Sequence, residues 1–403
     1  MVGALQKGFV VDKSIGEQRR IMVVTGEASG DLHGAHLIEA AQQMEPGIKF
    51  YGVGGKRMAE AGCEIVFPIE ELAVMGLVEV LGHLPRLYRA FRRLKKLIVG
   101  PDRPDVLVLI DFQEFNQRLA RVAKKAGIPV LFFVGPTVWA WRPGRVKTMA
   151  RAVDRLAVIF PFEPEYYRAE DLLVEYVGHP LLDELQAICE HGDIRGDLNI
   201  DPARPIVGLF PGSRKSELKY NFPTMIAAAK RIQQQIPEVQ FLLPVAPTFQ
   251  RVELHHVLQE NCLSVHLTEG NIYDVARACD AVLTVSGTVT LQVALAGTPM
   301  VIMYKAPALN YAIGRRLIKA PYIGLPNIVA GREVVREFIQ DQATADNLAD
   351  EILRVFDDKD YSQSMSQQLL QVRHKMGQAG CAQRVARMVL QMASPSLQKD
   401  QVS

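Results

Sequence analysis

The chain has 403 residues, which is longer than a single hydrophobic core normally serves, and its 48% hydrophobic and 22% charged residues are typical of a globular protein. The formal net charge of +2 provides no overall attraction to nucleic acid, so we expect no nucleic-acid partner. The five cysteines are scattered without a Cys-x-x-Cys pair, which favours a reducing cytoplasmic location over a disulfide framework or a metal site. The polar segment 1–20 does not resemble a signal peptide, and no stretch approaches the ~20 apolar residues of a membrane span.

The first half of the chain alternates short aliphatic runs with helical segments. Buried strands are predicted at 21–24, 51–53, 106–110, 130–134 and 156–160. Each run ends in a glycine, a proline or a polar turn. Strands that alternate with helices in this way predict a parallel, doubly wound sheet.

The alternation pauses and then restarts after a polar stretch rich in proline. Further strands are predicted at 206–210, 240–245, 264–267, 281–285 and 300–304. The predicted fold class is therefore α/β, with two Rossmann-like doubly wound domains facing across a cleft. We predict a polar extension (1–20), a first domain (21–190), a linker (191–205), a second domain (206–361), a last helix (362–392) and a tail (393–403). Whether the last helix crosses back onto the first domain is left open.

The turn after the strand at 206–210 is a candidate phosphate site. Pro211 and Gly212 end the strand, and a helix follows Ser213 and Arg214. A helix that begins at a glycine turn points free backbone N–H groups at one spot, where an anion is stabilised. Arg214 adds a planar fork suited to a phosphate. The alternative is an ordinary strand-to-helix turn with a surface arginine.

A second turn of the same kind follows the strand at 281–285. Ser286, Gly287 and Thr288 precede a helix that carries Gln292. Their hydroxyl and N–H groups can bind an anion or cap the helix. Two such turns in one domain would suit a diphosphate. No Gly-x-Gly-x-x-Gly follows the first strand and no Gly-Lys-Ser/Thr motif occurs, so a nicotinamide site and a Walker site are both excluded.

Carboxylates mark the corresponding edge of the first sheet. Asp111 directly follows five aliphatic residues, so it lies at the carboxyl end of a buried strand. Burial there would raise its pKa and favour a role as general base. The alternative is a helix cap. Glu27 and Asp31, in the turn after the first strand, have the same two interpretations.

The loop around 136–143 holds both tryptophans of the chain. Trp139, Trp141 and Arg142 lie between prolines, in a segment that is neither strand nor long helix. Aromatic and arginine side chains in such a loop contact sugars or bases in many proteins. The equally open alternative is that the indoles fill space between the domains.

The segment 72–99 combines an apolar stretch with a basic amphipathic helix. Six basic residues alternate with apolar residues at helical spacing: Arg86, Arg89, Arg92, Arg93, Lys95 and Lys96. This pattern suits an anionic membrane surface or a lipid substrate. The alternative is a surface helix that covers its own domain and exposes a solvated basic face.

These motifs together resemble the lipid-A-disaccharide synthase family, over about 21–390. The matching segments, in order along the chain, are Gly26-Glu27-Ala28-Ser29-Gly30-Asp31, Glu71-Leu72-Ala73-Val74-Met75-Gly76, Trp139-Ala140-Trp141-Arg142, Gly178-His179-Pro180-Leu181, Leu209-Phe210-Pro211-Gly212-Ser213-Arg214, Ser286-Gly287-Thr288, Leu325-Pro326-Asn327 and Gly331-Arg332-Glu333. The resemblance implies an inverting glycosyltransferase with the GT-B-type fold. It implies no cofactor and no metal ion.

The implied reaction joins UDP-2,3-diacylglucosamine to 2,3-diacylglucosamine 1-phosphate and yields a β-1,6-linked disaccharide 1-phosphate plus UDP. Asp111 would act as base, and Glu27 is the second catalytic candidate. The residues implied for UDP are Gly212, Ser213, Arg214, Ser286, Gly287, Thr288, Gln292 and Asn327. The residues implied for the acceptor or its lipid chains are Ser29, Asp31, Met75, Asn116, Trp139, Trp141 and Arg142.

The resemblance also implies a peripheral protein on the cytoplasmic face of the inner membrane of a Gram-negative-type bacterium, and a homodimer is left open. The chain departs from the family pattern at Gln292, where a glutamate is usual, and at Gln113-Glu114, where Pro-Asp is usual. The first change removes a charge beside the ribose, and the second predicts a differently shaped loop next to Asp111. The alternatives are a UDP-N-acetylglucosamine 2-epimerase-like enzyme and a weakened lipid- or nucleotide-binding homologue.

Overall fold

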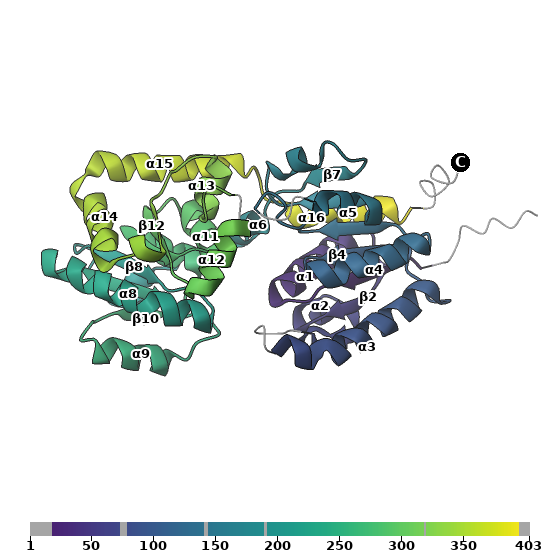
Figure 1. Cartoon of the computed structure of the whole chain (residues 1–403), viewed down its shortest axis with the longest axis horizontal. Helices are drawn as coiled ribbons and strands as arrows, with labels where there is room; N and C mark the ends of the chain where they lie inside the picture. The colour runs from purple at the N-terminus through teal and green to yellow at the C-terminus, as the bar shows by residue number, and fades with distance from the viewer. Residues whose placement is uncertain (1–17, 73–78, 141–143, 189–191, 318–319, 395–403) are drawn as a thin grey trace, which may run out of the picture.

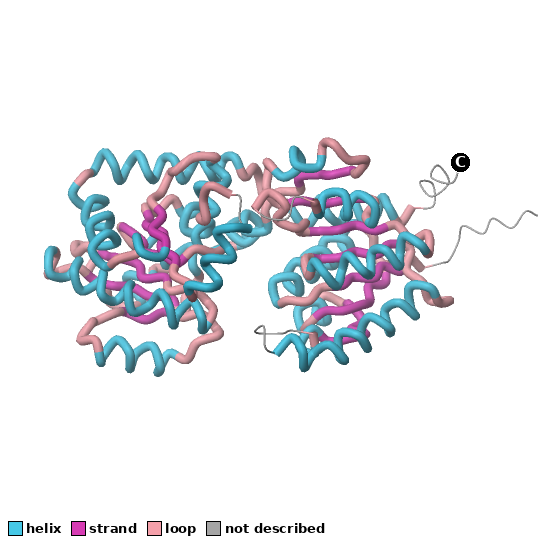
Figure 2. Tube along the Cα trace, in the orientation of Figure 1, coloured by secondary structure: helices cyan, strands magenta, loops and turns pink. Residues whose placement is uncertain are grey.

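Two parallel sheets, each with helices on both sides, form two lobes that lie side by side (Figures 1 and 2). This computed structural model describes residues 18–72, 79–140, 144–188, 192–317 and 320–394. The first sheet has the strand order β3-β2-β1-β4-β5-β6-β7, and the second has the order β10-β9-β8-β11-β12-β13. Neighbouring strands are parallel throughout both sheets. The predicted α/β fold class with two doubly wound sheets is confirmed.

The first sheet is built from residues 20–176. Its strands are β1 (Arg20–Val24), β2 (Lys49–Gly54), β3 (Cys63–Pro68), β4 (Val106–Ile110), β5 (Val130–Phe133), β6 (Arg155–Val158) and β7 (Leu173–Tyr176). The helices between and after them are α1 (Ala28–Met44), α2 (Lys56–Glu60), α3 (Glu79–Val99), α4 (Gln113–Lys125), α5 (Arg145–Ala152), α6 (Pro180–Ala187) and α7 (Ile194–Asp197).

Side chains of β1 alternate between the two faces of this sheet, as the strand period requires. Ile21 and Val23 pack in the core that α1 shares with the last helix of the chain, α16 (Cys381–Met392). Met22 and Val24 pack on the other face, in the core with α3, α4 and α5. Both faces are apolar because helices cover both, which explains the unbroken aliphatic strands.

The second sheet is built from residues 206–339. Its strands are β8 (Ile206–Phe210), β9 (Gln240–Pro244), β10 (His266–Thr268), β11 (Ala281–Val285), β12 (Met300–Tyr304) and β13 (Glu337–Ile339). Its helices are α8 (Lys215–Gln235), α9 (Arg251–Glu260), α10 (Ile272–Ala278), α11 (Thr288–Ala296), α12 (Ala308–Leu317), α13 (Leu325–Ala330), α14 (Ala345–Asp357) and α15 (Lys359–Lys375).

The basic amphipathic segment predicted from the sequence forms helix α3. Its apolar residues Ala90, Leu94 and Ile98 are buried in the first lobe, while the six arginines and lysines of 86–96 are exposed. The helix therefore covers its own core and presents a solvated basic face. Residues 73–78, which include Met75, lie outside the described part of the chain. Within that part, no helix is both long and apolar enough to cross a membrane.

The end of the chain differs from the single helix predicted at 362–392. Two helices, α15 and α16, occupy this region and are separated at 376–380. Figure 1 shows α15 lying along the second lobe and α16 lying in the first. Val385 and Val389 of α16 are fully buried in the core shared with α1. The chain thus returns to the first lobe after it has completed the second.

Asp183 of α6 holds α16 at this return. Its carboxylate accepts hydrogen bonds from the backbone N–H groups of Gly380, Cys381 and Ala382 at 2.5, 3.2 and 3.2 Å. Three otherwise unpaired donors at the helix start are satisfied by one carboxylate. Its negative charge also lies at the positive end of the helix dipole, so Asp183 stabilises α16 both by hydrogen bonding and by electrostatic attraction.

We expect Asp183→Ala to lower the free energy of unfolding by about 1–2 kcal/mol, since it removes the cap of a helix that completes the first core. Urea denaturation measures this change. Asp193→Ala, which removes the cap of the four-residue α7, is the matched control and should cost less. Equal losses in the two variants would contradict a special role of Asp183.

Candidate functional site

Each sheet has one point at which its strand order reverses direction. In the first sheet the reversal lies between β1 and β4, and in the second it lies between β8 and β11. Open α/β sheets bind ligands outside the carboxyl ends of strands at such points. The turns that follow these four strands begin at Thr25, Asp111, Pro211 and Ser286. These turns and the starts of the helices after them carry the predicted catalytic residues and the predicted UDP residues except Gln292, which lies further along α11, and Asn327.

A groove of about 790 Å³ runs along the carboxyl ends of β8, β9, β10 and β11. It brings together the two glycine turns that lie about eighty residues apart in the sequence. The predicted UDP residues that line it are Gly212, Ser213, Arg214, Ser286, Gly287, Thr288 and Gln292. A groove of this size is ample for a nucleotide.

The start of α11 is the open anion site in this groove. Gly287 precedes the helix and provides no side-chain cap, and Thr288 and Val289 of the first turn line the groove. The Thr290 N–H donates to the Gly287 carbonyl at 3.1 Å, so the N–H groups of Thr288 and Val289 are the candidate anion donors. Thr290 donates its hydroxyl proton to the Gly287 carbonyl at 2.8 Å, and Ser286 donates its own to the Ile323 carbonyl at 2.8 Å. The turn is thereby fixed before any ligand arrives, and the helix dipole favours an anion there.

The start of α8 is closed by Glu217, a residue that the sequence interpretation missed. Its Oε2 accepts hydrogen bonds from the Ser213 and Arg214 N–H groups at 3.0 and 3.2 Å, and its Oε1 accepts one from the Arg214 guanidinium at 3.2 Å. This is a capping box, in which a carboxylate holds the donors that a phosphate would otherwise use. The Arg214 side chain is 77% exposed, so its fork can still reach a ligand in the groove.

Asn327 does not belong to the groove, and its predicted contact with uridine is corrected. The side chain is fully buried beneath the loop that follows α13. Its Nδ2 donates to Val335 and Glu337, and its Oδ1 accepts from the Val334 and Val335 N–H groups. All four hydrogen-bonding positions of the amide are used, which leaves none for a nucleotide.

Asp111 occupies a strained turn at the reversal point of the first sheet. Asp111 and Phe112 both have φ near 47°, and Val134 at the end of the neighbouring β5 has φ of 61°. A left-handed conformation is costly for a bulky residue such as Phe. Phe112 packs directly over Gly26, where a Cβ would overlap its ring. The two turns of this reversal point therefore interlock.

The Asp111 carboxylate is half-buried and does not cap α4, since Phe112 takes the cap position there. Burial raises the pKa of the Asp111 carboxyl above its usual value. Hydrogen bonds from the Gln113 side chain and the Phe112 backbone partly offset this increase. A carboxylate with a raised pKa and no capping duty is suited to accept a proton.

Gln113, at one of the positions that depart from the family pattern, holds this carboxylate. Its Nε2 donates to Asp111 Oδ1 at 3.2 Å and to the Val134 carbonyl at 3.3 Å. A proline at this position could not make either contact. Gln113 therefore provides hydrogen bonds where the family pattern has a proline. Its amide links the Asp111 carboxylate to Val134, at the end of β5.

Asn116 supports the turn from below, and its predicted contact with the acceptor is corrected. The side chain is fully buried. Its Nδ2 donates to the carbonyls of Asp111, Ile110 and Val24 at 2.8, 3.2 and 3.4 Å. Asn116 thus ties the ends of β1 and β4 together and positions Asp111 from within the protein.

The turn after β1 separates the remaining acceptor candidates. Glu27 and Ser29 are exposed at the start of α1, and the Glu27 side chain makes no capping hydrogen bond. Asp31 is buried and accepts from the N–H groups of Gly55, Arg57 and Met58 at 2.6, 3.0 and 3.2 Å. Asp31 is therefore the cap of α2, which corrects its assignment to the acceptor.

Trp139 lies in an aromatic cluster that packs against the second core. Its indole N–H donates to Glu163 at 3.3 Å, and its ring meets Phe160 and Phe162 edge-on. The space-filling interpretation therefore accounts for these contacts of Trp139, while its assignment to the acceptor stays a prediction. Burial raises the pKa of Glu163 to about 7 although backbone N–H groups and the indole donate to it. Trp141 and Arg142 lie outside the described residues.

A second groove of about 940 Å³ joins the two lobes. His36 and Glu39 of α1 line one side, and Asn271, Ile272 and Gln292 line the other. These last three residues also line the nucleotide groove. The groove lined by α1 therefore adjoins the candidate nucleotide groove at these three residues. Among the described residues, no three His, Cys, Asp or Glu side chains are grouped to hold a metal ion.

The missed residues had different sequence signals. Glu217 lies three residues after Arg214 at a helix start, which is the spacing of a capping box. Gln113 was noted as a departure, but nothing in the sequence says that its side chain turns back to Asp111. Glu163 has no local signal at all, because its partner Trp139 comes from a separate loop.

Comparison with known proteins places the chain in a family. The model of the family described as lipid-A-disaccharide synthetase matches residues 21–389. The lipid-A-disaccharide synthase of Syntrophotalea carbinolica is 59% identical over 93% of this chain and 96% of its own length. That of Geobacter sulfurreducens is 47% identical over 93% and 97%. The chain belongs to the lipid-A-disaccharide synthase family.

Solved structures with the same fold include other members of the GT-B-type class. The UDP-GlcNAc 2-epimerase from Neisseria meningitidis bound to UDP-GlcNAc aligns with a TM-score of 0.62 at 12% identity, over 92% of this chain and 100% of that one. The glycotransferase of kitacinnamycin aligns with a TM-score of 0.60 at 15% identity, over 94% and 100%. At these identities the likeness shows the fold alone, so the lipid-A-disaccharide synthase relatives outweigh the epimerase alternative.

We expect Gln113→Leu to shift the acid limb of the pH profile of kcat/KM to higher pH. The amide N–H stabilises the charged carboxylate, so its removal raises the pKa of Asp111 further, and less of the base is ionised at low pH. Rates at high pH should change much less. The measurement is kcat/KM between about pH 5 and pH 9.

Gln117→Leu is the matched control, because Gln117 lies on the same helix and contacts Met149 instead of Asp111. Its acid limb should coincide with that of the unsubstituted protein. An unshifted limb in Gln113→Leu would show that the hydrogen bond does not tune the base.

Proposed function

We propose that this glycosyltransferase of lipid A synthesis transfers the sugar of UDP-2,3-diacylglucosamine to the 6-hydroxyl of 2,3-diacylglucosamine 1-phosphate. The observation that carries the proposal is the pairing of two unlike sites. A half-buried carboxylate stands at one reversal point, and an open helix start with an exposed arginine stands at the other. A transfer from a diphosphate needs both a proton acceptor and a site for the departing charge.

In this mechanism Asp111 accepts the proton of the acceptor's 6-hydroxyl. The oxygen attacks the anomeric carbon from the face opposite UDP, so a β-1,6 bond forms as the bond to the phosphate oxygen breaks. The configuration at the anomeric carbon is inverted. The negative charge that moves onto UDP is stabilised by Arg214 and by the N–H groups at the start of α11. Glu27 is the second carboxylate on the acceptor side, with Ser29 beside it.

We further propose that the protein works at the cytoplasmic face of the inner membrane. The support is the exposed basic face of α3, whose six arginines and lysines are all solvent-accessible. Each basic residue near an anionic membrane contributes about 1 kcal/mol of attraction. The apolar stretch that precedes α3 in the sequence would supply the second, hydrophobic contribution.

The direct test of the function is release of UDP by the purified protein from the two lipid substrates in detergent. We expect release only when both lipids are present. UDP-N-acetylglucosamine without a lipid acceptor should give no product. Turnover of that soluble sugar alone would favour the epimerase-like alternative, and absence of any turnover would favour a binding protein.

We expect Asp111→Ala to lower kcat by about 10²–10⁴-fold or more, the range that a positioned general base contributes, while the Kd for UDP stays nearly unchanged. The reason is that Asp111 belongs to the first lobe and the nucleotide groove to the second. Glu114→Gln removes a neighbouring carboxylate and is the control. Retained transfer in Asp111→Ala would falsify the base assignment.

We expect Arg214→Ala to weaken UDP binding by about 10- to 100-fold, because it removes a charge-assisted contact to the diphosphate. Isothermal titration with UDP measures the change. Lys215→Ala removes the same charge one residue further on, outside the groove lining, and should bind UDP as the parent protein does. The same affinity in both variants would rule out a phosphate contact for Arg214.

A further inference from the structure

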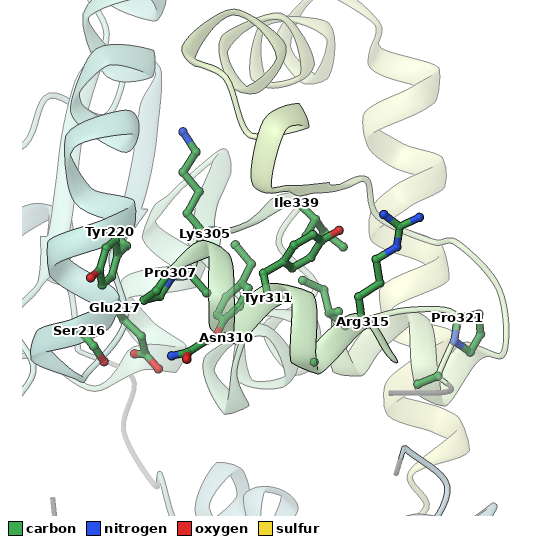
Figure 3. A pocket seen from close by; sticks show the side chains of 15 residues that line it. Ser216, Glu217, Tyr220, Lys305, Pro307, Asn310, Tyr311, Arg315, Pro321 and Ile339 are labelled. Carbon is green, nitrogen blue, oxygen red and sulfur yellow. The ribbon is translucent and has the colours of Figure 1, made fainter. Parts of the chain in front are cut away.

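A pocket of about 390 Å³ opens in the second lobe beside the nucleotide groove. It lies between the start of α8, the end of β12 and α12. Figure 3 shows Glu217 and Tyr220 of α8 on one side and Tyr311 and Arg315 of α12 on the other. Apolar and aromatic side chains form most of its wall, including Tyr304, Pro307, Ile323 and Ile339. The mechanism above does not use this pocket.

The pocket shares its walls with both phosphate turns. Glu217 lines the pocket and the nucleotide groove, and it accepts the N–H groups of Ser213 and Arg214. Ile323 lines the pocket, and its carbonyl accepts the hydroxyl proton of Ser286 at 2.8 Å. A group bound to these turns therefore has the pocket directly at its side.

The pocket is fixed by hydrogen bonds rather than formed by loose loops. Asn221 of α8 is fully buried and bonds to the Lys305 N–H at 2.7 Å and to the Lys305 carbonyl at 3.2 Å. On the opposite wall, Glu337 accepts the N–H groups of Ile323 and Gly324 at 2.8 and 2.9 Å. A site held in this way loses little conformational entropy when a ligand enters.

The chemistry of the lining selects the ligand. Three tyrosines and several aliphatic and proline side chains present apolar surface, and Arg315 lines the pocket as a cation, whereas the Lys305 ammonium donates to the Thr224 hydroxyl at 3.1 Å. This combination suits a hydrocarbon chain that is attached to an anionic headgroup. Ser216, Glu217 and Asn310 are the other polar side chains of the lining, so a polar sugar or a second nucleotide would leave most of its hydrogen-bonding groups unpaired against this wall.

We propose that this pocket holds a fatty acyl chain of the UDP-linked donor. The inference rests on the proposed function and extends it, because it places part of the donor in the second lobe. The acyl groups at positions 2 and 3 branch from the same sugar ring whose anomeric carbon carries the diphosphate. With the diphosphate at the two glycine turns, one of these chains enters the adjacent pocket. The acceptor approaches from Asp111 in the other lobe, so its chains lie elsewhere.

The proposal predicts a dependence of donor affinity on chain length. Each methylene that leaves water for an apolar site contributes about 0.8 kcal/mol, which is about fourfold in affinity. The donor KM should therefore fall as its chains lengthen until the pocket is filled. UDP alone has no chain, and its affinity should not depend on the pocket.

The test fills the pocket with a side chain. Gly314 lies on α12 and lines the pocket, so Gly314→Phe places a ring in the space for the acyl chain. Ala312→Phe, on the same helix at an exposed position outside the lining, is the matched control. Donors with a series of acyl lengths are assayed by UDP release, at fixed acceptor and in detergent, and UDP binding is measured separately.

We expect Gly314→Phe to raise the KM for long-chain donor at least tenfold, to flatten its dependence on chain length, and to leave the acceptor KM and the Kd for UDP unchanged. Ala312→Phe should behave as the parent protein. Tyr311→Ser removes apolar wall instead of adding bulk and should flatten the same dependence, which protects the test against misfolding of one variant.

An unchanged chain-length dependence in both Gly314→Phe and Tyr311→Ser would overturn the proposal. A rise in the acceptor KM with an unchanged donor KM would also overturn it, by assigning the pocket to the acceptor. Failure of the parent protein to release UDP from the two lipids would instead contradict the proposed function itself, so the two failures are distinguishable.

Discussion

The left-handed turn at Asp111 and Phe112 is the constraint on which the catalytic half of the structure depends. Two consecutive non-glycine residues at positive φ are unfavourable, and they persist only because the surroundings enforce them. The Asn116 side chain donates a hydrogen bond to the Asp111 carbonyl, and the Phe112 ring packs against Gly26. The result is a carboxylate that does not cap α4, where an ordinary strand-to-helix turn would have used it as a cap. The strained backbone thus leaves Asp111 available as the proposed proton acceptor.

The second lobe carries the proposed site for negative charge. Its two helix starts look alike in sequence but differ in the structure. Glu217 accepts the N–H groups of Ser213 and Arg214 just before α8, while Gly287 provides no side-chain cap at the start of α11. The proposed diphosphate site therefore combines the start of α11 with an arginine side chain that is already oriented by a carboxylate. This difference explains how both glycine turns can contact one ligand although Glu217 already accepts the N–H groups at one of them.

The central strands could be predicted from the sequence, and of the four edge strands only β10 was predicted. Runs such as 106–110 are aliphatic throughout because helices cover both faces, whereas β3, β7 and β13 carry Glu64, Glu175 and Glu337 and are only partly buried. The position of Asp111 at a strand end also followed from the sequence. Its unusual backbone did not, because the residues that enforce it come from separate turns.

The roles of the polar residues were harder to predict than their positions. Asp31, Asn116 and Asn327 each lie in a motif that reads as a ligand site. In the structure each satisfies backbone groups of the protein. A carboxylate or amide in a glycine-rich turn has the same appearance in sequence whether its partner is a substrate or a distant N–H group. Gly55, for example, lies 24 residues from Asp31, and the local sequence around Asp31 gives no sign of this hydrogen bond.

The base and the diphosphate turns belong to different lobes, so their separation depends on how the lobes are joined. The chain passes between them twice, after α6 and between α15 and α16. Asp183 connects these two passages directly, since it lies on α6 and binds the first N–H groups of α16. The two connections are therefore bonded to each other. Asp183 and Gly380 also line the groove that α1 shares with Gln292, so this junction forms part of the wall between the lobes. In the proposed mechanism the base and the departing diphosphate lie on opposite lobes, so proton transfer and departure of the diphosphate both depend on the junction that Asp183 holds together.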